Sequence, residues 1–143
     1  MNEPIDPRLD QITDALYRVS VKLLIVKDGK LLTVQEPQGW YGIPGGGINH
    51  GQNLYEGLLR ELDEELGITS VTPETISPLP SIVSNAGVID GIPRLTLFYT
   101  THQEVQPSNN ELSFYWASTE DLRSLTLAPN IAPIREQLID HLE

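Results

Sequence analysis

The chain has 143 residues, 39% of them hydrophobic and 20% charged, which is the composition of one globular domain rather than of a disordered segment. Nine basic and 20 acidic residues give a net charge of −11, and a field of that sign repels nucleic acids and anionic membranes. The absence of cysteine excludes a disulfide framework and thiol chemistry, and it fits a reducing, cytoplasmic location.

The first 16 residues are expected to form an N-terminal arm, because they contain two prolines and only a weak helical pattern. Their polar, acidic start is unlike a signal peptide, and no stretch of the chain approaches the roughly 18 apolar residues that span a membrane. Residues 17–143 are then expected to form a single domain.

A strand pair opens that domain. Residues 18–26 predict a strand that enters a buried sheet, and residues 30–35 predict the returning strand after a tight turn at Asp28-Gly29. Arg18, Ser20 and Lys22 share one face of the first strand, by the period of two. They either meet phosphates or face solvent.

A glycine-rich loop and a capped helix follow. The loop, residues 38–51, reads QGWYGIPGGGINHG. Its two aromatic residues, Trp40 and Tyr41, either stack on a nucleotide base or pack beneath the loop. The helix is expected over residues 53–66, with Asn53 as its N-cap and Gly67 as its C-terminal stop.

Further strands and helical segments complete the pattern. Strands are expected at 82–84, 94–101 and 112–117, and helical segments from Ser118 and at 133–142. Because strands and helices alternate, the sequence predicts an α/β layered domain with a mixed sheet.

The helix carries an excess of acid in the stretch RELDEELG, residues 60–67. A helical wheel gives one face that must be buried, made by Leu58, Leu59, Leu62 and Leu66. Glu61, Glu64 and Glu65 form a narrow carboxylate face beside it, whereas Asp63 points elsewhere. Like charges at these spacings repel, so the glutamates are either an ordinary solvated face or a cation site.

Glycines favour the cation site. Gly57 lies within the carboxylate face, where glycine costs about 0.5–1 kcal/mol relative to alanine and is reasonable only if a ligand or another backbone comes close. Before the helix, Gly45, Gly46 and Gly47 allow carbonyls or amides to face a ligand. Carbonyl and carboxylate oxygens together suit a hard divalent cation, and Mg²⁺ fits best.

These residues resemble the Nudix box, usually written G-x5-E-x7-R-E-U-x-E-E-x-G-U with U a bulky aliphatic residue. The match runs from Gly46 to Ile68, and every fixed position agrees except Gln52, where the family usually has glutamate. The resemblance implies an α/β/α sandwich with a central mixed sheet. It also implies Mg²⁺-dependent hydrolysis, with Mn²⁺ able to substitute, of the pyrophosphate linkage of a nucleoside diphosphate derivative.

The resemblance implies roles for single residues. Glu64 and Glu65 look like metal ligands, and Glu61 looks like a ligand or the base that activates water. Arg60 is similar to the arginine that holds these glutamates, and the Gly45 carbonyl is similar to a further ligand.

Outside the central glutamates, Glu111 is a candidate catalytic base or metal ligand, because some family members place an extra glutamate in this region. The alternative is an exposed acidic loop residue. Candidates for substrate binding are Arg18, Tyr41 and Gly46. The expected partner is a small nucleotide, with no nucleic acid and no membrane, and a homodimer is left open.

Gln52 leaves two functions open. Compared with the usual glutamate, it removes one negative charge from the site and is expected to interact more weakly with Arg60. The chain is either a hydrolase or a Nudix-like nucleotide-binding or regulatory module with weakened catalysis. The intact Glu61, Glu64 and Glu65 favour the enzyme. Nucleotide sugars, ADP-ribose and (d)NTPs all remain open as substrates, as does the number of metals.

Overall fold

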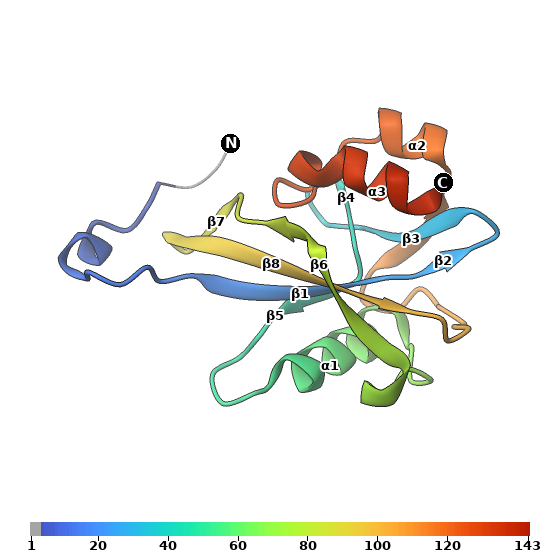
Figure 1. The fold of residues 1–143 in the computed structure, drawn as a ribbon, viewed down its shortest axis with the longest axis horizontal. Coiled ribbons are helices and arrows are strands. Elements are labelled where there is room, and N and C mark those ends of the chain that lie inside the picture. The colour runs from blue at the N-terminus through green and yellow to red at the C-terminus, as the bar shows by residue number, and fades with distance from the viewer. Residues whose placement is uncertain (1–3) are drawn as a thin grey trace.

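Helix α1 (Leu54–Leu66) covers one side of the strands, and helices α2 (Thr119–Ser124) and α3 (Arg135–Leu142) cover the other (Figure 1). The computed structural model describes residues 4–143. The predicted α/β/α sandwich is therefore confirmed, and the strands between its helical layers divide into two sheets.

The first sheet is mixed and has the spatial order β5-β1-β8-β6, with β7 also pairing with β8. Strand β1 is parallel to β8, and the other pairs are antiparallel. Its strands are β1 (Arg18–Leu24), β5 (Gly45–Gly47), β6 (Ile76–Ser84), β7 (Val88–Ile89) and β8 (Ile92–Thr101). The expected mixed sheet is thus present.

The second sheet is antiparallel and has β3 at its centre. Its strands are β2 (Val26–Lys27), β3 (Lys30–Gln35), β4 (Tyr41–Gly42) and β9 (Ser113–Ala117). Short 3-10 helices are η1 (Pro7–Gln11), η2 (Pro73–Thr75) and η3 (Ala132–Ile134).

Two segments differ from the sequence-based expectation. Part of the glycine-rich loop is a strand, because Gly45–Gly47 pair with the edge of β1. Strand β6 begins at Ile76 rather than at residue 82 and contains Pro78 and Pro80. It lies at the edge of the sheet with a register shift after Pro78, and an edge tolerates residues that lack a backbone N–H.

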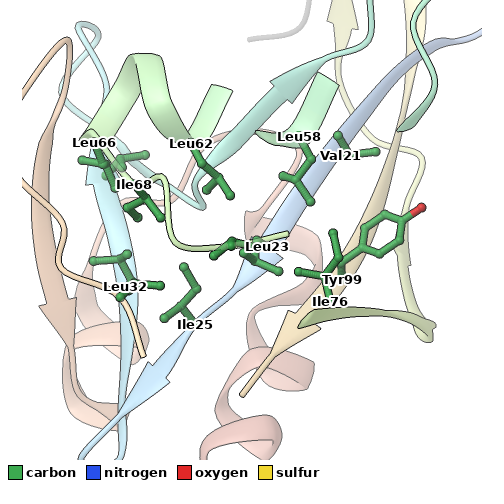
Figure 2. Close-up of a cluster of buried hydrophobic side chains, with 13 residues drawn as sticks. Val21, Leu23, Ile25, Leu32, Leu58, Leu62, Leu66, Ile68, Ile76 and Tyr99 are labelled. Carbon is green, nitrogen blue, oxygen red and sulfur yellow. The ribbon is translucent and has the colours of Figure 1, made fainter. Parts of the chain in front are cut away.

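The buried face of α1 matches the predicted leucine face. Leu58, Leu62 and Leu66 are all 0% exposed and pack in one cluster with Val21 and Leu23 of β1 (Figure 2). Burial of leucine side chains at about 25 cal/mol per Å² fixes the helix on the sheet, and with it the direction of its carboxylates.

Both ends of α1 are capped as the sequence predicts. The Asn53 side chain accepts a hydrogen bond of 2.8 Å from the Glu56 N–H. Gly67 is left-handed, with φ of 64°, and its N–H donates to the Asp63 carbonyl. The helix boundaries are therefore set by local chemistry.

The N-terminal arm extends away from the three layers (Figure 1). Its helix η1 buries no residue, and the Asp6 N–H donates a hydrogen bond of 2.7 Å to the Gly91 carbonyl. Residues 1–3 of the predicted arm lie outside the described residues. Over the part of the chain that is described, every helix is too short or too polar to cross a membrane.

Candidate active site

The carboxylates of α1 lie against the glycine strand β5. Glu65 Oε1 accepts a hydrogen bond of 2.9 Å from the Gly45 N–H. A Cβ added to Gly46 would lie only 2.6 Å from the Glu61 carboxyl carbon, so a glycine is required for this approach. Gly46 therefore makes room for Glu61, and its predicted contact with substrate stays a prediction.

Arg60 lies between two of these glutamates. One guanidinium nitrogen, Nη2, is 3.2 Å from Glu61 Oε1, and the other, Nη1, is 3.7 Å from Glu64 Oε2. Nη2 also donates to the Gly47 carbonyl. Arg60 therefore forms ion pairs with both glutamates, and the role that the resemblance implies for it stays a prediction.

Gln52 is directed to the loop rather than to Arg60. Its Oε1 accepts a hydrogen bond of 3.0 Å from the Asn49 N–H. Arg60 Nε is buried and has no hydrogen-bond partner among the described residues. The Gln52 oxygen is therefore used within the loop, and Arg60 keeps one buried donor without an acceptor among the described residues.

Gly57 has a packing role that the sequence did not reveal. A Cβ at this position would collide with the Cδ1 atom of Ile48 in the preceding loop. The close approach inferred from the sequence is therefore to a side chain of the protein itself and not to a ligand.

The segment that carries Glu111 packs on the C-terminal end of α1. Asn110 Nδ2 donates to the Glu64 carbonyl at 2.8 Å, and the Leu112 N–H donates to the Glu65 carbonyl at 3.3 Å. Glu111 lies close enough to add to the negative potential at Glu61. The structure therefore brings this exposed residue to the carboxylate site.

Burial makes the charged form of two of the glutamates costly. Burial raises the pKa of Glu65 to about 7, although Lys22 and the Gly45 N–H oppose the shift. Burial also raises the pKa of Glu61, with Arg60 opposing it and Glu64 adding to it. A cation bound here would stabilise these carboxylates in their charged form.

A divalent cation suits this donor set, because the three carboxylates offer only hard oxygen ligands. Across residues 4–143, however, no three acidic or histidine side chains are grouped closely enough to hold an ion as they stand. Glu64 is 45% exposed and can rotate. The carboxylates therefore fit a hard divalent cation in their chemistry, although they do not yet converge on one point.

The first strand turns its polar face inward. Ser20 is 0% exposed and Lys22 is 5% exposed, so the solvent-facing alternative is wrong for both. Lys22 Nζ donates to the Gly45 carbonyl at 2.9 Å, and Arg18 Nη1 donates to the Ile48 carbonyl at 2.9 Å. Burial lowers the pKa of Lys22, and Glu65 opposes this shift most strongly.

A cleft of about 380 Å³ adjoins this strand face. Trp40, Glu36 and Arg94 line it, together with the β7 hairpin. Arg94 Nε donates to Ser20 Oγ at 3.0 Å, which joins the cleft to β1. Tyr41 is not among the lining residues, since its ring packs against Tyr115 with centroids 6.1 Å apart.

Sequence reasoning missed Glu36 and Arg94. Arg94 reaches the site only because β8 lies parallel to β1, with Arg18 opposite Arg94. No local pattern indicates that pairing, since the two residues are far apart in the chain.

Comparisons with known proteins agree with this geometry. The NUDIX domain family profile matches residues 16–142. The uncharacterized Nudix hydrolase YvcI of Bacillus subtilis (strain 168) is 29% identical over 118 residues, which cover 80% of this chain and 73% of that protein. CTP pyrophosphohydrolase of Escherichia coli (strain K12) is 28% identical over 121 residues, which cover 81% and 87%.

Solved structures share the fold. The E. coli ORF135 protein matches with a TM-score of 0.65 and 25% identity, over 88% of this chain and 91% of that one. The MutT protein from Methanosarcina mazei Go1 matches with a TM-score of 0.65 and 23% identity, over 90% and 96% of the two chains. The family profile covers most of the chain, and the carboxylate helix packs on the glycine strand as the box pattern implies. This chain therefore belongs to the Nudix family of pyrophosphohydrolases, enzymes that act on phosphoric anhydrides.

Proposed function

We propose that this chain hydrolyses the pyrophosphate linkage of a small nucleoside di- or triphosphate derivative, using Mg²⁺ or Mn²⁺ held by Glu61, Glu64 and Glu65. The observation that carries the proposal is the contact of the α1 carboxylates with β5, where Glu65 accepts from the Gly45 N–H. It brings carboxylate oxygens of the helix and backbone of the glycine strand together.

Each part of the site has a task in this reaction. The bound cation supplies neutralisation of phosphate charge and a lowered pKa of coordinated water. Arg60 orients Glu61 and Glu64, with which it forms ion pairs. In this proposal Glu61 orients or deprotonates the attacking water, and Glu111 supports it.

The cleft supplies a place for the nucleotide. Trp40 offers an aromatic surface for a base, and Arg94 offers a cation for a phosphate. Arg18, which borders Gly47, is a further phosphate-binding candidate. The relative that acts on CTP, by its name, favours a nucleoside triphosphate over a larger dinucleotide.

The test is turnover of a nucleotide panel with Mg²⁺ or Mn²⁺, comparing wild type with Glu64→Gln and Glu65→Gln. Asp63→Asn is the matched control, because Asp63 is an exposed acid on the same helix. We expect both glutamine variants to lose about 100-fold or more in kcat, and the control to stay near wild type.

Two outcomes would contradict the proposal. No turnover on any substrate would favour the nucleotide-binding module. Turnover that survives both substitutions would overturn the assignment of the metal ligands.

A further inference from the structure

A buried lysine lies among the carboxylates of the site. Lys22 is 5% exposed, and its ammonium donates a hydrogen bond of 2.9 Å to the Gly45 carbonyl. The N–H of the same glycine donates to the Glu65 carboxylate at 2.9 Å. Gly45 therefore connects the lysine to Glu65 through its two backbone polar groups.

Position and charge together explain why a lysine is tolerated in the interior. A buried ammonium is costly unless negative groups surround it. Glu65, Glu36 and Glu61 all lie close enough to act on the Lys22 charge. Lys22 thus stabilises a cluster of acids that would otherwise need another cation.

The Gly45 carbonyl is the backbone atom that a divalent ion would use beside Glu65. It already accepts a hydrogen bond from a positive charge. A divalent ion bound to the same oxygen would lie within several ångströms of the ammonium and would be repelled by it. Metal at this oxygen and the observed position of Lys22 are therefore in competition.

Gln52 also favours a smaller number of bound divalent ions. The residue that stands in place of the usual glutamate of the Nudix box is neutral, and its oxygen is used by the Asn49 N–H. Compared with the usual Nudix box, the chain therefore has one negative charge fewer, and it has a buried positive charge among the site's glutamates. Both changes reduce the number of divalent ions needed for neutrality.

We propose that the Lys22 ammonium takes the place of one divalent cation at the Gly45 carbonyl, as a positioning residue that confines metal to the carboxylate oxygens of Glu61, Glu64 and Glu65. This inference rests on the proposed metal-dependent function. It assigns to Lys22 a role in metal number that no pattern in the sequence indicates.

The first test counts bound Mn²⁺ by the paramagnetic resonance signal of the unbound ion. Wild type is compared with Lys22→Met, which keeps the length of the side chain without its charge, and with Lys30→Met, an exposed lysine, as control. We expect Lys22→Met to bind about one Mn²⁺ more per chain than wild type and Lys30→Met to match wild type.

The outcomes separate this inference from the proposed function. A folded Lys22→Met chain that binds the same number of Mn²⁺ ions as wild type, or fewer, overturns the role of Lys22. A wild-type chain that binds no Mn²⁺ overturns the proposed function, and the inference with it. Circular dichroism of each variant shows whether the fold is kept.

The second test needs no substitution at Lys22. The chain has three lysines, Lys22, Lys27 and Lys30, so a nitrogen-detected spectrum of lysine ammonium groups is simple to assign by Lys27→Arg and Lys30→Arg. We expect the slowly exchanging Lys22 signal to persist at saturating Mg²⁺. Its loss or its shift to that of an exposed lysine would show that metal displaces it from Gly45, which overturns the inference.

Discussion

At the scale of single residues, the site is built from backbone as much as from side chains. Gly45 donates to Glu65 and accepts from Lys22, and Gly46 leaves space for Glu61. Both glycines therefore serve contacts inside the protein.

Gly45→Ala tests this view. Gly45 has φ of +131°, and a Cβ there would collide with the Val21 carbonyl oxygen. An alanine would be strained at this positive φ, and its Cβ would also overlap the backbone of Val21. Because these two costs add, we expect the free energy of unfolding in urea to fall by about 3 kcal/mol or more. Gly51→Ala is the control: its φ is +88° with no neighbour within 4 Å, and about 1 kcal/mol is expected. Equal losses would contradict the account.

Gln52→Glu tests the departure from the family pattern. The added carboxylate restores the negative charge that the family usually has at this position, so we expect the Mg²⁺ concentration for half-maximal activity to fall up to about fivefold, or to stay unchanged. Gln103→Glu adds the same charge on an exposed turn outside the site and is the control. A large loss of activity in Gln52→Glu alone would refute this reading.

At the scale of elements, side-chain caps mark the beginning of α1 and α2. In α2, the Asp121 carboxylate accepts hydrogen bonds of 2.9 Å from the Ser118 N–H and from the Tyr115 hydroxyl, and the Asp121 N–H donates to Ser118. The cap ties α2 to strand β9, which contains Tyr115. The Ser118 N–H, with Tyr115 next, lowers the pKa of Asp121 below its ordinary 3.8.

The sign of this shift gives a pH dependence. Since the folded pKa is the lower one, the carboxylate stabilises the fold above pH 3.8, and this contribution is lost as the pH falls below it. We expect the difference in unfolding free energy between wild type and Asp121→Asn to shrink between about pH 5 and pH 2. Glu120→Gln in the same turn is the control, and a difference independent of pH would contradict the role of the carboxylate.

At the scale of the whole molecule, three layers hold the site and the arm stands outside them (Figure 1). Two core clusters, one beneath α1 and one beneath α2 and α3, contain the buried apolar residues. The arm contributes to neither, and several exposed apolar side chains lie along it, namely Ile5, Ile12 and Leu16.

Deletion of residues 1–16 tests the predicted domain boundary. Since η1 buries no residue, we expect the free energy of unfolding to change by less than about 1 kcal/mol. The hydrogen bond from Asp6 to Gly91 is lost, which loosens the turn beside the cleft. Thermal and urea unfolding of the shortened chain provide the measurement, and a loss of several kcal/mol would place the arm within the domain.

Much of the local structure was predictable from the sequence. The buried leucines of α1, its Asn53 and Gly67 caps, the Asp28-Gly29 turn and the spacing of the glutamates are all as expected. These features depend on periodicity and on hydrogen bonds between residues a few positions apart, so the sequence alone determines them.

The tertiary structure decided the rest. The strand pairing of Gly45–Gly47, the inward direction of Lys22 and the arrival of Arg94 beside Ser20 all join segments that are distant in the chain. The sequence around a charged strand residue is the same whether its side chain faces water or a buried carbonyl. Only the packing of β1 against β5 and β8 decides which of these the side chain meets. The sequence by itself determined the family and the carboxylate helix, whereas the fold determined which charges meet them.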